Sequence, residues 1–121
     1  NKDIKSFLLD QKFVSGIGNI YASEILFSSK VNPFKKVGSL SKKECQIIIL
    51  NSKKILLRAI AKGGSSIRDF KDTSGLKGGF QNEFKVYQQE GNKCKNLGCS
   101  NIIKKKITSN RSTFFCNICQ K

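Results

Sequence analysis

Histidine, methionine and tryptophan are missing from this chain of 121 residues, and proline occurs once. Without histidine, no imidazole can serve as a general base or a metal ligand, so acid–base chemistry would fall to carboxylates, lysines or thiols. No apolar run approaches the roughly 18 residues of a membrane span, and the charges within residues 1–10 argue against a signal peptide. We therefore expect no membrane contact and a cytoplasmic location.

Acidic residues are scarce: 8 Asp and Glu stand against 23 Lys and Arg, which gives a net charge of +15. A field of this sign concentrates polyanions and speeds their capture, so nucleic acid is the expected partner. The alternative is a compositional bias, because Lys, Asn and Ile are common in proteins from AT-rich genomes. The hydrophobic share of 38% is enough for one helical core.

Four of the five cysteines lie in two close pairs, Cys94 with Cys99 and Cys116 with Cys119. This spacing suits a tetrahedral Zn²⁺ with four thiolates at about 2.3 Å. The segment has too few apolar residues to build a core, so one structural zinc ion would supply its folding free energy. Two disulfides are the alternative, but they need an oxidising compartment that nothing here indicates. Cys45 is interpreted as a small buried apolar residue rather than a reactive thiol.

The first part of the chain is expected to be helical. Apolar positions at i, i+3 and i+4 predict a short helix over residues 4–12. A second helix is predicted from Asn19 until the approach to Pro33 stops it. Its apolar face would comprise Ile20, Ile25 and Phe27.

The pattern Ser41-Lys-Lys-Glu44 is a capping box, which marks the start of a third helix. This helix should run to about Lys62 and end at the glycine pair that follows. We expect its apolar run Ile47–Leu50 to lie in the core.

The last part of the chain is expected to be loop-rich. Glycine and serine are frequent in residues 63–85, which is typical of a connector or a functional lid. Phe84–Tyr87 is expected to be a short extended lead-in to the cysteine-rich segment. Residues 102–107 and 111–116 flank a polar turn and predict a β-hairpin between the two cysteine pairs. The predicted fold class is mainly α with a small β-hairpin zinc finger.

A glycine turn separates the first two helices. Gly16 and Gly18 would let backbone N–H groups approach an anion, and the second helix points its positive end at the same place. Asn19 would add a neutral side-chain donor. Gly-x-Gly turns are common, so on these grounds phosphate contact and a purely structural turn remain alternatives.

A longer stretch is more specific. Residues 9–24, which include Gly-Ile-Gly-Asn-Ile-Tyr-Ala-Ser-Glu, closely resemble the helix–two-turn–helix segment of bacterial formamidopyrimidine-DNA glycosylases. The resemblance covers essentially the whole chain: residues 63–70 are similar to the lead-in to the family's lesion-capping loop, 73–80 to that loop, and 111–121 to the end of its zinc finger. It implies a helix–two-turn–helix DNA-binding domain over residues 1–85 and a four-cysteine zinc-finger β-hairpin over residues 86–121.

The resemblance implies the DNA-binding C-terminal portion of a base-excision-repair DNA glycosylase and AP lyase that removes oxidised purines. Its partner would be double-stranded DNA with a damaged purine or an abasic site, and we expect a monomer. The family's catalytic N-terminal proline and glutamate lie in a domain outside this chain, so the chain alone is expected to be inactive. The alternatives are a stand-alone DNA-binding zinc module, or an RNA-associated zinc ribbon, which leaves the Gly16–Glu24 block unexplained.

The resemblance also assigns roles to residues. Asn19 and the turn at Gly18 would bind backbone phosphates beside the lesion, and Lys2 and Lys5 would add phosphate contacts. Arg111, near the hairpin tip, would bridge two phosphates with its guanidinium fork and act in the second elimination step, which removes the 3′ phosphate bond. The family's first cysteine knuckle is usually Cys-x₂-Cys; the wider spacing here should reshape the knuckle and leave the metal site intact.

Overall fold

The computed structural model of the chain describes residues 2–10, 18–61, 84–108 and 110–121. The elements in order are α1 (Ile4–Leu9), α2 (Asn19–Ser29), η1 (Val37–Ser39), α3 (Lys42–Ala61), β1 (Lys104–Thr108) and β2 (Arg111–Phe115). This confirms the predicted fold class. The glycine turn at Gly16, the end of the third helix at residues 62–64 and the lesion-capping loop predicted at residues 73–80 lie outside the described residues.

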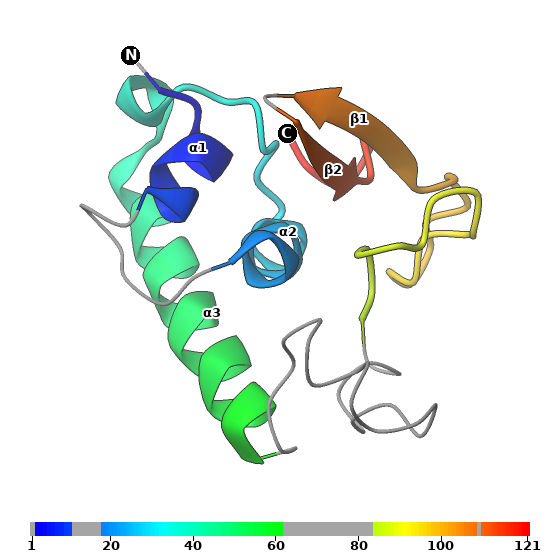
Figure 1. Cartoon of the computed structure of the whole chain (residues 1–121), viewed down its shortest axis with the longest axis horizontal. Helices are drawn as coiled ribbons and strands as arrows, with labels where there is room; N and C mark the ends of the chain where they lie inside the picture. The colour runs from blue at the N-terminus through cyan, green and yellow to red at the C-terminus, as the bar shows by residue number, and fades with distance from the viewer. Residues whose placement is uncertain (1, 11–17, 62–83, 109) are drawn as a thin grey trace.

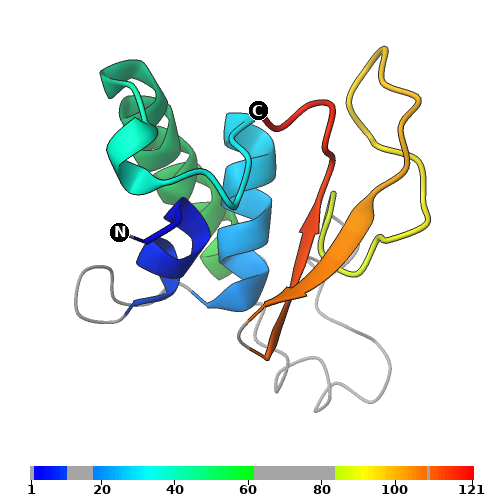
Figure 2. The ribbon, with the colours of Figure 1, turned by 90° about the horizontal axis from the view of Figure 1, so that it is seen from above.

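The central element is α2. It lies between α1 and α3 on one side and the β-hairpin on the other (Figure 1, Figure 2). The predicted single apolar face is too narrow, because α2 is buried nearly all round. Its buried residues are Ile20, Ala22, Ser23, Glu24, Ile25, Leu26, Phe27 and Ser29. The helix ends at Lys30, which has a left-handed φ of 60°, and it therefore stops before Pro33 as predicted.

Helix α1 begins at residue 4 as predicted, but it ends at Leu9 and not at residue 12. The Asp3 carboxylate caps the N-terminus by accepting the N–H of Ser6 at 2.8 Å. Asp10 is extended at the C-terminus, and its N–H donates to the Phe7 carbonyl. The helix carries Ile4 and Leu8 into the core.

Helix α3 starts with the predicted capping box. The N–H of Ser41 donates to Glu44 Oε1 at 2.8 Å, and the N–H of Glu44 donates to Ser41 Oγ at 3.0 Å. The core assignment is correct for Ile48, which is 4% exposed, but wrong for Ile49 and Leu50, which are 56% and 53% exposed. Four consecutive helical residues point in different directions, so one face of α3 cannot bury the whole run.

Cys45 is exposed, so the prediction that it is buried is wrong. The residue borders an open apolar groove between α1, η1 and α3, whose walls include Phe7, Leu40 and Ile49. The first turn of α3 therefore faces this groove at Cys45 instead of packing into the protein interior.

The hairpin confirms the prediction to within two residues at each end. Strands β1 and β2 are antiparallel, with Lys104 opposite Phe115 and Thr108 opposite Arg111. The extended conformation predicted for Phe84–Tyr87 is wrong, because these residues form bends and a turn. The backbone N–H groups of residues 85–87 point at a side chain of α2 instead of at a neighbouring strand.

Two apolar clusters meet at α2. One joins α2 to α1 and α3 through Ile25, Leu26 and Ile48. The other joins Ile20 and Phe27 of α2 to the C-terminal segment; its further members are Phe84, Val86, Tyr87, Cys94, Ile103, Phe114 and Cys116. The division of the chain at residue 85 remains a prediction, but the second cluster crosses it.

Candidate nucleic-acid interface and metal centre

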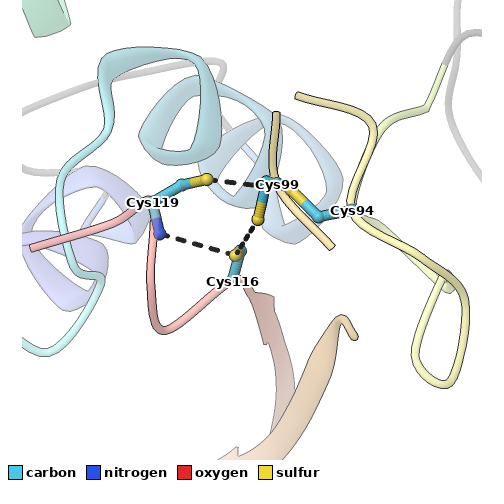
Figure 3. Close-up of side chains that lie close together, drawn as sticks. All are labelled: Cys94, Cys99, Cys116 and Cys119. Carbon is cyan, nitrogen blue, oxygen red and sulfur yellow. Dashed lines mark hydrogen bonds between the residues drawn. The ribbon is translucent and has the colours of Figure 1, made fainter. Parts of the chain in front are cut away.

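The four paired cysteines form one cluster. Their Sγ atoms all lie within 4.8 Å of one another, and the Cys94–Cys119 and Cys99–Cys116 separations are both 3.8 Å. Figure 3 shows the four side chains converging from two backbone segments. A tetrahedral ion with metal–sulfur bonds of about 2.3 Å requires sulfurs about 3.8 Å apart. The cluster therefore fits a four-coordinate, thiolate-bound metal ion.

The groups around the cluster favour thiolate at Cys116. Burial would raise the pKa of its thiol, but the side-chain amide of Asn101 and the backbone N–H groups of Cys119 and Ile118 outweigh burial and lower it to about 6. The Asn101 amide lies 3.4 Å from the sulfur. Burial raises the pKa of Cys94 to about 12. These hydrogen bonds favour the thiolate form of Cys116, and a bound cation would favour the thiolate form of all four cysteines.

Gln120 joins the cysteine cluster to the helices. Its side-chain oxygen accepts the N–H of Cys116 at 2.8 Å, and its amide donates to the Val31 carbonyl at 3.0 Å. The residue is 1% exposed. The buried side chain of Gln120 therefore connects the cysteine cluster to the segment that follows α2.

The start of α2 is open. Gly18 occupies the cap position with no side-chain cap bond. Its φ of −101° is available to any residue, and a Cβ placed there would meet nothing within 4 Å. Nothing in the described structure therefore requires glycine at this position. A glycine at this position leaves room for an external group to approach the backbone at the start of the helix.

Asn19 and Lys5 both contact the strand that carries Arg111. Asn19 Nδ2 donates to the Ser112 carbonyl at 3.0 Å. Lys5 Nζ donates to the same carbonyl at 3.3 Å and to Thr113 Oγ1 at 2.8 Å. Asn19 Oδ1 is buried and has no hydrogen-bond partner among the described residues. Two helices thus hold β2 immediately beside Arg111.

Lys5 is buried, with 4% of its surface exposed. Burial lowers its pKa to about 8, and the charge of Arg111 lowers it further, against a smaller opposite effect of Asp3. The phosphate contact assigned to Lys5 remains a prediction. The structure adds contacts with Ser112 and Thr113 that the sequence did not indicate.

The residues assigned to phosphate binding come together on one side of the molecule. Lys2, Lys5 and Arg111 line one hollow between α1 and the hairpin tip, and Asn19 and Arg111 line a second hollow. Lys2 also forms an ion pair with Asp10 at 2.6 Å. Arg111 itself is exposed. Segments more than 90 residues apart in the sequence therefore place donors and positive charge around two hollows that share Arg111.

Sequence reasoning missed Glu24. Its side chain is 4% exposed and accepts hydrogen bonds from the backbone of residues 85–87. A signal was present, because Glu24 is the one charged residue in the otherwise apolar or small stretch of residues 20–29. Such a residue in a buried helix requires partners.

The sequence of the chain is similar to those of known proteins. Residues 1–71 match the family model described as the formamidopyrimidine-DNA glycosylase H2TH domain. The whole chain is 46% identical to a formamidopyrimidine-DNA glycosylase of Roseobacter denitrificans and covers 43% of that protein. A second such protein, from Phenylobacterium zucineum, is 41% identical over 97% of the chain and 41% of its own length. The chain thus spans less than half the length of these relatives.

Solved structures show the same likeness. The chain is similar to the Lactococcus lactis Fpg in a complex with abasic-site DNA, with a TM-score of 0.85, 38% identity, and coverage of 99% of this chain and 42% of that one. A complex of the Lactococcus lactis protein with FAPY-dG-containing DNA gives the same values. No helix within the described residues has the length and apolar character to cross a membrane.

Proposed function

This chain belongs to the formamidopyrimidine-DNA glycosylase family through its H2TH domain, and from that premise we propose that it is the DNA-gripping portion of a base-excision-repair enzyme. The enzyme would be a bifunctional glycosylase and AP lyase acting on oxidised purines. It would be located in the bacterial cytoplasm, bound to the DNA. Its duplex partner carries the damaged base or abasic site. The chain acts as a monomer that supplies the grip on the DNA backbone, while the nucleophile belongs to a domain outside it.

The convergence of Asn19 and Arg111 carries this proposal. The amide of Asn19 binds the residue that follows Arg111 in β2, so the helix start and the hairpin tip face a common space. The N-terminal end of α2 and the donors Lys2, Lys5, Asn19 and Arg111 suit a run of phosphates. The guanidinium of Arg111 has the fork geometry for two phosphate oxygens.

Arg111 also suits the second elimination step. A guanidinium held against the 3′ phosphate stabilises the negative charge that develops on this leaving group as the bond to the sugar breaks. The hairpin holds the arginine in place, since β1 pairs with β2 up to Thr108 opposite Arg111. We propose zinc as the metal held by the four cysteines, in a structural role that fixes this hairpin.

Binding to duplex DNA with one abasic site tests the proposal. Fluorescence anisotropy of the labelled duplex should give a dissociation constant that rises steeply with salt, because phosphate contacts release counterions. Arg111→Ala should weaken binding by about 1–3 kcal/mol and reduce the salt slope by about one. Lys43→Ala, an exposed lysine on α3, is the matched control and should change binding much less. Salt-independent affinity, or equal losses in both variants, would contradict the proposal.

The location of the nucleophile is tested separately. Borohydride reduces a Schiff base between an enzyme amine and an abasic site to a stable covalent complex. We expect no such trapping with this chain alone, even at concentrations at which it binds the duplex. Efficient trapping would show that the nucleophile lies within these residues.

A further inference from the structure

The buried carboxylate of Glu24 has no part in the proposed phosphate contacts. Its Oε1 accepts the N–H of Lys85 at 2.9 Å. Its Oε2 accepts the N–H groups of Val86 and Tyr87 at 2.9 and 2.8 Å. Successive backbone N–H groups that converge in this way form a concave site of the kind that binds free anions. Here the anion is a side chain of the protein itself.

Burial of a carboxylate costs free energy, so this arrangement would be unfavourable if Glu24 served only to fill space. Burial raises the pKa of Glu24, and the three backbone hydrogen bonds and the charge of Lys85 only oppose that shift. A buried carboxylate is tolerated when its hydrogen bonds are made. An apolar side chain would fill the same volume without this cost but would leave three N–H groups, two of them buried, without this acceptor. The carboxylate is therefore matched to the backbone of residues 85–87.

Residues 85–87 in turn support the strand that carries Arg111. The Tyr87 ring packs edge-on against Phe114 of β2, with centroids 5.1 Å apart. Val86 is fully buried in the cluster that joins α2 to the hairpin. The preceding residue, Phe84, is bound to the cysteine-rich segment, because Lys95 Nζ donates to its carbonyl at 3.0 Å. Contacts thus run without a break from Glu24 through Tyr87 and Phe114 to β2.

Helix α2 therefore holds β2 in two ways. Asn19 binds it directly at the Ser112 carbonyl, and Glu24 supports it through Tyr87 and Phe114. We propose that Glu24 is a positioning residue for DNA binding, which fixes the backbone of Lys85–Tyr87 and thereby sets the orientation of Arg111 relative to Asn19. This inference rests on the proposed function, because it assumes that both residues contact one DNA strand.

The substitution Glu24→Gln distinguishes a positioning role from a purely electrostatic one, because the two roles predict changes in DNA affinity of opposite sign. It removes one negative charge, so charge alone predicts tighter binding to DNA. Glutamine keeps one acceptor oxygen but turns an amide donor toward the backbone N–H groups, so the segment cannot keep its position. We expect the dissociation constant for abasic duplex DNA to rise by about tenfold. Glu90→Gln makes the same charge change at an exposed site and should bind equally well or more tightly.

The comparison is made on folded protein. Circular dichroism well below the melting temperature and metal analysis establish that each variant is folded and holds one metal ion. Under these conditions a purely structural role, which lowers only the melting temperature, leaves the affinity unchanged. A folded, metal-loaded Glu24→Gln variant that binds DNA as tightly as the unaltered chain, or more tightly, overturns the inference.

Two further measurements apply if Glu24→Gln does not fold. Phe114→Leu removes the ring contact to Tyr87 but keeps Glu24, and it should also weaken binding. In the unaltered chain, the amide proton resonances of Lys85, Val86 and Tyr87 should shift together as the Glu24 carboxylate titrates. Full affinity in Phe114→Leu, or amide resonances that ignore this titration, overturns the inference. Absence of salt-dependent binding by the unaltered chain counts instead against the proposed function.

Discussion

Lys5 is a buried lysine that lines the candidate interface together with Lys2 and Arg111. Its folded-state pKa of about 8 lies below the ordinary value of 10.5. A bound phosphate favours the charged form, so we expect DNA affinity to fall as pH rises through about 8. Lys5→Met, which has no titrating group, should lack this step. Anisotropy titrations of both proteins over this pH range make the measurement, and parallel pH profiles would contradict the assignment.

The lowered pKa of Lys5 also makes the stability of the free protein depend on pH, in the direction opposite to that of DNA affinity. Between about 8 and 10.5 the unfolded chain keeps a proton on Lys5 that the folded chain has lost. The contribution of this group to the free energy of unfolding therefore rises with pH through that window. Without DNA, higher pH favours the fold at Lys5, while with DNA it weakens the complex.

Residue-level prediction succeeded where the signal was local. The cysteine pairs predicted a cluster of thiols that could hold a metal ion, because ligand spacing is a short-range property. Lys5 and its partner Thr113 are 108 positions apart in the sequence. Glu24 and its backbone partners are 61 to 63 positions away. No short-range pattern encodes such a pairing, so only the folded arrangement reveals it.

At the scale of elements, the capping box of α3 provides a measurable contribution. The hydrogen bond from Lys35 lowers the pKa of Glu44 below its ordinary 4.5, and the bond from the N–H of Ser41 acts in the same direction. Glu44→Gln should therefore lower the free energy of unfolding at neutral pH by about 0.5–1 kcal/mol. The deficit should disappear as pH falls through the folded pKa, because both proteins then carry a neutral side chain.

Urea unfolding at neutral and acidic pH measures this difference. Glu90→Gln serves as the control, since its 3.9 Å ion pair with Lys105 is exposed and contributes little. A deficit that persists unchanged in acid would show that Glu44 acts by shape and not by charge.

Element boundaries followed the sequence where caps define them. Ser41 and Glu44 marked the start of α3, and the approach to Pro33 marked the end of α2. The conformation of Phe84–Tyr87 could not be predicted in this way. Its apolar residues suit a strand, but the acceptor for its N–H groups lies on α2. Tertiary contacts therefore decided the local conformation.

At the scale of the molecule, metal removal should affect more than the cysteine segment. Ile20 and Phe27 of α2 share one apolar cluster with Cys94 and Cys116, and Gln120 binds Val31. A strong chelator should therefore abolish DNA binding and also reduce amide protection along α2. Hydrogen exchange with and without chelator makes the measurement; the Ile48 side of α3 provides the internal reference. Full protection of α2 in the metal-free protein would show that the two parts are independent.

An effect of metal removal on α2 means that the two domains predicted from the sequence are not independent. The family resemblance implies a division of the chain at residue 85, with the helical periodicity and the cysteine spacing on different sides of it. The sequence does not show that α2 is apolar on both sides for two different neighbours. Burial of Ile25 toward α3 and of Phe27 toward the hairpin shows this only in the folded chain.

The exposed thiol of Cys45 has a practical consequence. It borders the groove between α1, η1 and α3, and α3 lies across α2 from the hairpin (Figure 1). The other four thiols form the cysteine cluster. A maleimide fluorophore should therefore attach at this one position when the metal is bound. Such a label would lie away from Asn19 and Arg111 and would report the slower rotation of the molecule when the proposed DNA complex forms.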